Sequence, residues 1–350
     1  MNQLDAETLQ CVLDQDVELP RIDRDDESDL GGLLYALGHH TEARQVQHVQ
    51  TAGNNLHRLN AVTALCHDLA RIDAEPILLP GAALLRLYPD VGCRSMEDID
   101  LLVEASMRSH VVDALERYGW QTLPRHPDLF TRLDGCTIDL HTDLLNGDRL
   151  TNRRRAGWIE PSQAWSRCQR RDVAGFQLLT LGDEDELLVT AAHALRHSYR
   201  RLTWLIDLVL QLRATPVNGQ ALWTFAKGTG LHHQLRYVLE VVDGSQVSLP
   251  SWVAACRRQN PLPAWVVSVL GWIQLHRQET VVGELPSCWT CSSGLDRIRF
   301  VAEFVFPRQD VLMQVYPRLP PRLAPLVYPL RLLQIVGRGV SELAFAVRRR

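Results

Sequence analysis

The sequence has almost no lysine and no long apolar run. Lys227 is the single lysine, and all other basic side chains are arginine, which we interpret as genomic base composition rather than as a site. No uninterrupted apolar stretch approaches the ~20 residues that a membrane-spanning helix requires. The Met1 end is acidic and has no apolar segment behind a basic head, so we expect no signal peptide and a cytoplasmic protein.

Cysteine is also sparse. The eight cysteines are scattered along 350 residues, which favours reduced thiols over a disulfide framework. Cys288 and Cys291 have the spacing of metal ligands, but neither a second pair nor a histidine-rich segment accompanies them. Because a structural zinc site needs four ligands, we expect no zinc at this pair.

The length and composition predict several packed units. A chain of 350 residues exceeds one ordinary core, and 46% apolar residues can fill two or three. We expect an α+β protein with an N-terminal helical segment (1–75), a central unit with a small mixed sheet (76–178) and a C-terminal all-helical domain (179–350). The net charge of −4 implies no stable nucleic-acid partner, and the oligomeric state stays open.

The first half of the chain changes its apolar period at Pro76. Between residues 56 and 72, apolar side chains recur every three or four positions, which predicts a packing helix. Residues 77–79 form a short apolar run that ends at a Pro-Gly pair, and a helical pattern follows over 82–88. This order predicts a strand, a tight turn and a helix. A further helix is predicted over 106–118.

A hairpin is predicted next. Residues 129–133 and 136–140 flank Asp134-Gly135, which is a favoured two-residue turn, so these segments should be antiparallel strands. Residues 146–175 show no regular period, and we expect them to be irregular and basic. From Leu181 the pattern is helical, with helices predicted over 187–197, 202–212, 219–241, 250–259, 263–277, 293–305 and 330–348.

Acidic side chains gather on two of the predicted strands. In an extended strand Asp98 and Asp100 point to the same side, and Asp139 and His141 share one face of the later strand. Carboxylates on neighbouring strands supply the oxygen ligands that Mg²⁺ prefers. The competing interpretations are that Asp98 caps the strand entry and that Asp139 pairs with Arg132 across the hairpin.

The ordered motifs resemble the nucleotidyltransferase superfamily that includes DNA polymerase beta, and specifically its branch of uncharacterised bacterial nucleotidyltransferases. The resemblance rests on residues 78–84, 88–103, 138–141 and 181–208, and it extends over roughly residues 30–245. It implies a polymerase-beta-like catalytic core and transfer of a nucleoside monophosphate from an NTP, such as ATP, to an acceptor. It also implies Mg²⁺, or Mn²⁺, as the cofactor. The acceptor, whether small molecule, protein or RNA, is not indicated by the sequence.

The resemblance assigns roles to individual residues. Asp98 and Asp100 would bind both metal ions of a two-metal site, and Asp139 would complete the ion that activates the acceptor. The predicted nucleotide contacts are Gly81, Ala82, Arg94, His193 and Asp207, and the predicted substrate contacts are His141 and His197.

Several of these assignments have a structural alternative. His141 can bond a neighbouring carboxylate, and the other two histidines can simply pack between helices. Asp207 stands in an apolar stripe, where a buried carboxylate needs a partner, and Arg196 or Arg201 can provide it.

The glycine loop departs from the family pattern. Many members of the branch have lysine directly before the glycine, and the wider superfamily has Gly-Ser, whereas this chain has Pro80-Gly81-Ala82. The change removes a phosphate-binding cation and a hydroxyl donor. A second hypothesis is therefore a catalytically degenerate nucleotidyltransferase-like protein that acts as a binding or interaction module.

Overall fold

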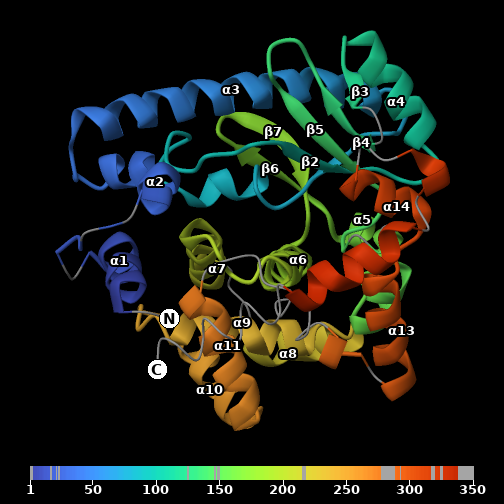
Figure 1. Cartoon of the computed structure of the whole chain (residues 1–350). Coiled ribbons are helices and arrows are strands. Elements are labelled where there is room, and N and C mark those ends of the chain that lie inside the picture. The colour runs from blue at the N-terminus through green and yellow to red at the C-terminus, as the bar shows by residue number, and fades with distance from the viewer. Residues whose placement is uncertain are drawn as a thin grey trace.

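The structure combines one sheet with a large helical body. The computed structural model describes residues 3–15, 18–20, 22, 24–123, 126–145, 147, 150–214, 218–276, 288–291, 293–316, 320–323 and 326–337. Figure 1 shows the sheet in the upper half, with the long helix α3 (Glu42–Ala70) running across it and the helical body below. The expected α+β class is confirmed. None of the described helices is long and apolar enough to cross a membrane.

Seven strands form a single mixed sheet in the order β3-β4-β5-β2-β1-β7-β6. Their bounds are β1 Ile77–Leu78, β2 Ile99–Leu102, β3 Gln121–Leu123, β4 His126–Thr131, β5 Thr137–His141, β6 Gln169–Val173 and β7 Phe176–Thr180. The central pairs β2–β5 and β1–β7 are parallel, and β4–β5 is antiparallel. The predicted antiparallel hairpin is confirmed, but its two-residue turn was wrong: Arg132 N donates to Cys136 O, so Leu133, Asp134 and Gly135 all lie in the turn, where Gly135 has a positive φ of 83°.

One face of the sheet is covered by α3 and α4 (Arg108–Arg117). The alternating pattern of β2 and β5 sends Ile99, Leu101, Ile138 and Leu140 to this face, where each is at most 1% exposed. The apolar stripe predicted between residues 56 and 72 packs against them, although α3 begins earlier, at the Thr41 N-cap. The opposite, polar face of these two strands is consequently left for a site.

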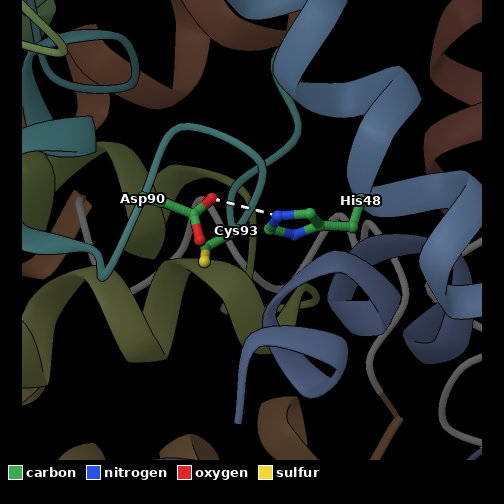
Figure 2. A group of neighbouring side chains, drawn as sticks. All are labelled: His48, Asp90 and Cys93. Carbon is green, nitrogen blue, oxygen red and sulfur yellow. Dashed lines mark ion pairs between the residues drawn. The ribbon is translucent and has the colours of Figure 1, made fainter. Parts of the chain in front are cut away.

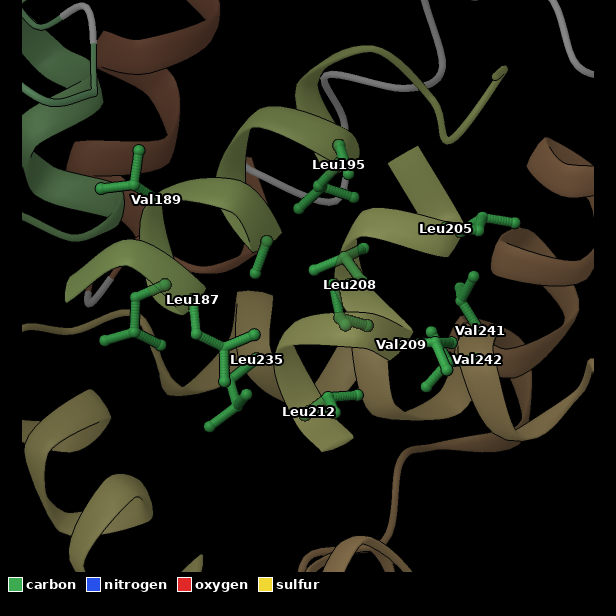
Figure 3. Packing of buried hydrophobic residues seen from close by; sticks show 14 of the residues in the cluster. Leu187, Val189, Leu195, Leu205, Leu208, Val209, Leu212, Leu235, Val241 and Val242 are labelled. Atoms are coloured by element: carbon green, nitrogen blue, oxygen red, sulfur yellow. The ribbon is translucent and has the colours of Figure 1, made fainter. Parts of the chain in front are cut away.

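The helical body packs around α6 (Asp183–Arg196), α7 (Leu202–Ala214) and α9 (His232–Asp243), whose leucines and valines interdigitate in Figure 3. The remaining helices are α1 Gln3–Asp14, α2 Arg24–Ala36, α5 Pro161–Arg167, α8 Gly219–Gly228, α10 Ser251–Gln259, α11 Ala264–His276, α13 Gly294–Val305, α14 Gln309–Val315 and a helix over 326–337. Three 3₁₀ segments are η1 Ala83–Leu87, η2 Thr151–Ala156 and η4 Pro321–Leu323.

Several predicted boundaries were wrong. The helix predicted over 82–88 is the short 3₁₀ segment η1, and the helix predicted over 219–241 is two helices, because Gly230 takes a positive φ of 74° between them. The segment 146–175 is not irregular: it holds η2, α5 and the hairpin strand β6, with β7 starting directly after it. The last predicted helix lies partly outside the described residues, which end at 337.

Candidate active site

The register of two parallel strands builds the floor of the site. Asp100 of β2 lies beside Asp139 of β5, and Leu102 lies beside His141. Because residues two apart share a face, Asp100, Asp139 and His141 all project from the polar side of the sheet. The observed strand register therefore places these side chains on the same face of the sheet, as the sequence predicted.

His141 lies between the two carboxylates. Its Nε2 is 2.8 Å from Asp100 Oδ1 and 3.6 Å from Asp139 Oδ2. The imidazole and the two carboxylates offer three donor atoms that all lie within 4.8 Å of one another. This set of two hard oxygen donors and one nitrogen suits a divalent cation. The histidine–carboxylate alternative for His141 is thus seen directly, within the same cluster as the predicted metal ligands.

Asp98 adds a further carboxylate at the entry to β2. Its side chain keeps an exposed surface toward the cleft. Loss of hydration, followed by repulsion from Asp100 and Asp139, raises the pKa of Asp98 to about 6. Crowded carboxylates of this kind are stabilised by a bound cation. The floor therefore has the electrostatics of a cation site.

The alternative partner considered for Asp139 is engaged elsewhere. Arg132 Nε donates to Asp134 Oδ2 at 2.8 Å, next to the hairpin turn. The pKa of Asp134 is held far below its usual range, chiefly by this hydrogen bond. Asp139 thus remains in the cluster on the sheet floor.

A cavity of about 660 Å³ opens above this floor, between the sheet and the helical body. Every predicted site residue except Ala82 lines it; these are Gly81, Arg94, Asp98, Asp100, Asp139, His141, His193, His197 and Asp207. Ala82 is 2% exposed and belongs to the core under the sheet. The structure thus gathers residues separated by more than a hundred positions into one cleft of a size suited to a small-molecule substrate.

Arg94 and Asp207 form a buried ion pair on the wall of the cleft. Arg94 donates from Nε to Asp207 Oδ1 at 2.9 Å and from Nη2 to Oδ2 at 2.8 Å, and the Tyr88 hydroxyl donates to Oδ1 at 2.7 Å. Burial opposes the charge on Arg94, but the contact with Asp207 outweighs it and raises the arginine pKa. The partner of Asp207 is therefore Arg94, rather than the Arg196 or Arg201 considered from the sequence.

The two histidines of α6 belong to an aromatic cluster with Trp204 of α7. The ring centroids of His193 and His197 are 4.7 Å apart, and each lies 5.2 to 5.3 Å from the Trp204 ring. Loss of hydration, reinforced by the charge of Arg196, lowers the pKa of His193 well below its usual value. His193 is thus neutral near pH 7. Both histidines pack between the helices and also line the cleft, so the packing role and the cleft-lining role are compatible.

Arginines on the helical side were not predicted as substrate contacts, and Arg196 and Arg201 were considered only as partners of Asp207. The cleft is also lined by Arg153 of η2, by Arg196 at the end of α6 and by Arg200, Arg201 and Arg331. Arg201 Nη2 donates to Glu97 Oε1 at 2.6 Å. A wall rich in arginine opposite a floor of carboxylates can hold a polyanion and its cations. The cluster of basic residues from 196 to 201 is the sequence signal for this wall.

The glycine loop borders the same cleft. Gly81 has a φ of 116°, a conformation that favours glycine, and Pro80 and Gly81 both line the cavity. The helix predicted after this glycine is the five-residue 3₁₀ segment η1. A segment this short has a weak dipole, so helix-dipole binding of phosphate is not available at this loop.

Comparison with known proteins gives a family match and a match to a solved structure. A family described as uncharacterised nucleotidyltransferase matches residues 41–243, which include every predicted site residue from Gly81 to Asp207. An antigenic nucleotidyltransferase-like protein from Paracoccidioides brasiliensis, known from a crystal structure, is 15% identical, with a TM-score of 0.34 over 55% of this chain and 94% of that chain. No curated protein matches.

Proposed function

The chain belongs to the uncharacterised nucleotidyltransferase family, and on that premise we propose that it transfers a nucleoside monophosphate from an NTP to an acceptor. The observation that carries the proposal is the β2–β5 register, which sets Asp100 beside Asp139 on the polar face of the sheet. Asp98 stands at the entry to the same strand, and a cavity of about 660 Å³ opens above all three. Residues 76–178 would form the catalytic unit and the helical half would recognise the acceptor.

Asp98, Asp100 and Asp139 are the residues proposed to hold Mg²⁺, with Mn²⁺ as the alternative ion. When bound, the metal neutralises the leaving pyrophosphate and makes the acceptor a better nucleophile. Two of these acids, Asp100 and Asp139, form with His141 a group whose donor atoms lie within 4.8 Å of one another, and carboxylate oxygens are the hard ligands that Mg²⁺ prefers. His141, bonded to Asp100 at 2.8 Å, fixes the orientation of that carboxylate.

The arginine wall is proposed to orient the triphosphate. Arg196 and Arg200 line the cleft opposite the carboxylate floor, where guanidinium groups can donate to phosphate oxygens. Arg94 has little left to offer a phosphate, since Nε and Nη2 donate to Asp207 and Nη1 donates to the Ser95 carbonyl at 3.3 Å. Asp207 is then a positioning residue that holds Arg94, and His193 and His197 form the adjoining apolar and aromatic surface.

Incubation of the full chain with α-labelled NTPs, Mg²⁺ and a cell extract tests the proposal. Label should move to an acceptor with the wild-type protein and not with the variant carrying Asp98→Ala and Asp100→Ala. Glu104→Gln, which removes an exposed acid just beyond β2, is the matched control and should transfer label normally. Lack of transfer with every nucleotide, or transfer that survives the double substitution, would refute it.

The alternative is a catalytically degenerate protein that binds a partner. It is supported by the Pro80-Gly81-Ala82 loop, by the brevity of η1 and by the engagement of Arg94 with Asp207. Calorimetric titration with NTP distinguishes the two functions. Mg²⁺-dependent NTP binding argues for catalysis, whereas its absence in a folded protein favours the interaction module.

A further inference from the structure

A second cluster of metal-binding side chains lies away from the cleft floor, where α3 crosses the loop between η1 and β2. It consists of His48 from α3 and of Asp90 and Cys93 from the loop, and their donor atoms all lie within 4.8 Å of one another. Figure 2 shows the His48 ring directed at the Asp90 carboxylate, with the Cys93 sulfur on the other side of that carboxylate. Cys93 is buried, whereas the Asp90 side chain is 45% exposed.

A hydrogen bond between the His48 ring and the Gly32 backbone determines which ring nitrogen is protonated, and so which one can bind a metal ion. His48 Nδ1 lies 3.0 Å from the carbonyl oxygen of Gly32, and a carbonyl only accepts, so Nδ1 carries the hydrogen. In the neutral ring, Nε2 therefore presents its lone pair toward Asp90. A backbone carbonyl bonded to the second nitrogen is also the usual support of a metal-binding histidine.

The distance between the His48 and Asp90 side chains is the one expected for two ligands of a single metal ion. Nε2 and Oδ1 are 3.4 Å apart, which is longer than the ~2.7–2.9 Å of a charge-assisted hydrogen bond. Two ligands bound to the same tetrahedral zinc ion, each ~2.0–2.2 Å from it, are about 3.4 Å apart. The spacing therefore matches two ligands of one ion better than a direct ion pair.

A cluster of the same composition elsewhere in the chain provides an internal comparison. His57, Asp134 and Cys136 also bring their donor atoms within 4.8 Å. There, His57 Nε2 lies 2.8 Å from Asp134 Oδ2, and the same oxygen accepts from Arg132 Nε at 2.8 Å. The carboxylate is saturated and no space remains for an ion. Asp90 lacks such an arginine partner among the described residues: its Oδ1 accepts from the Gly92 amide at 2.7 Å and lies 3.4 Å from His48 Nε2.

We propose that His48, Asp90 and Cys93 form a binding site for a zinc-class divalent cation, with solvent at the fourth position. Imidazole, thiolate and carboxylate are the ligands that Zn²⁺ takes in proteins, and the exposure of Asp90 leaves the ion a route from solvent. The site differs from the Mg²⁺ site proposed on the sheet by its sulfur ligand. A result that refutes one of these two sites would therefore leave the other unaffected.

The loop that carries Asp90 and Cys93 packs closely against α2 and α3. Gly92 passes so close to α3 that an added Cβ would lie 2.7 Å from His48, and its carbonyl oxygen would lie 2.2 Å from a Cβ on Gly32. Asn55 Nδ2 donates to the carbonyls of Val91 and Arg94, at 2.8 and 2.7 Å. The ion would clamp this loop to α2 and α3. Because Arg94 directly follows Cys93 in this loop, the clamp would also hold the arginine that binds Asp207.

Cobalt substitution tests the site through its sulfur ligand. The full chain, stripped with a chelator and titrated with Co²⁺, should develop a thiolate-to-cobalt charge-transfer band at one equivalent. Cys93→Ser should abolish the band, and the matched Cys136→Ser should leave it unchanged. The band cannot come from the carboxylate floor of the cleft, whose donors are Asp98, Asp100, Asp139 and His141.

Two further variants keep the test informative if Cys93→Ser does not fold. His48→Asn keeps a donor near the position of Nδ1 and removes Nε2, and Asp90→Asn keeps an acceptor for the Gly92 amide. Each should weaken Zn²⁺ binding, measured by competition with a chromophoric chelator, by at least ~10-fold. A wild-type protein without the band would overturn the proposal. So would a band that survives Cys93→Ser and disappears in Cys288→Ser.

Discussion

The acidic side chains on the wall of the cleft are neutralised by paired cations, whereas those on the floor are crowded together. On the wall, the carboxylate of Asp207 is matched by a bidentate guanidinium and a tyrosine hydroxyl, all of them buried. On the floor, three acids share one neighbouring histidine, and their mutual repulsion contributes to a raised pKa at Asp98. A fully matched charge holds the fold together. A crowded set of like charges is what a bound cation would stabilise, as we propose for this floor.

The largest effect is expected from breaking the matched pair. Asp207→Ala leaves the Arg94 guanidinium buried without its counterion, which typically costs about 3–5 kcal/mol. We therefore expect the free energy of unfolding, measured by urea denaturation, to fall by that amount. An effect under about 1 kcal/mol would contradict the description of this pair as a structural tie.

A double variant serves as the control for this prediction. Arg94→Met combined with Asp207→Leu removes both charges and leaves apolar groups in the same space, which is often neutral for a buried pair. Most of the stability lost in Asp207→Ala should return. Since both residues line the cleft, NTP binding should be measured alongside stability.

The features predicted correctly from the sequence depend on local chemistry. The Asp134-Gly135 turn specifies its hairpin, and a period of two fixes which side chains of β2 and β5 share a face. Asp100 and Asp139 meet because each strand alone already directs its aspartate to the polar side. That β2 and β5 are neighbours was assumed in the prediction of the metal ligands, and the structure shows them paired in parallel.

The features that were missed depend on contacts between distant segments. Asp207 lies 113 residues from Arg94, and no local pattern distinguishes this arginine from Arg196 or Arg201. The strand β6 has one fully buried side chain among five, Val173, because it forms an edge of the sheet. Its polar sequence therefore lacks the alternation by which a strand is recognised.

The next largest effect concerns a half-buried histidine whose neighbours are also basic. Burial, reinforced by His233 and Lys227, lowers the pKa of His232 to about 4. The unfolded chain binds a proton near pH 6.5 and the folded chain does not, so stability should fall as the pH drops from about 6.5 toward 4. The slope contributed by this group is at most about 1.4 kcal/mol per pH unit.

Urea denaturation between pH 7.5 and 4.5 measures this slope. His232→Gln should flatten it over that interval, while His110→Gln, on the exposed side of α4, should leave it unchanged. The comparison concerns slopes, because either substitution can shift stability equally at all pH values. An unchanged slope in His232→Gln would show that the ring is already protonated in the folded protein.

The smallest effect, opposite in sign to that of Asp207→Ala, is expected on the floor of the cleft. Asp98→Asn removes one of three crowded acids from a partly exposed position, so without metal the protein should be stabilised, by less than about 1 kcal/mol. Mg²⁺ should stabilise the wild-type protein by mass action and should stabilise the variant less. Glu104→Gln should respond to Mg²⁺ as the wild type does. If Asp98→Asn were strongly destabilising, this aspartate would be a structural cap of the strand. The contrast between a charge-paired wall and a cation-binding floor would then be wrong.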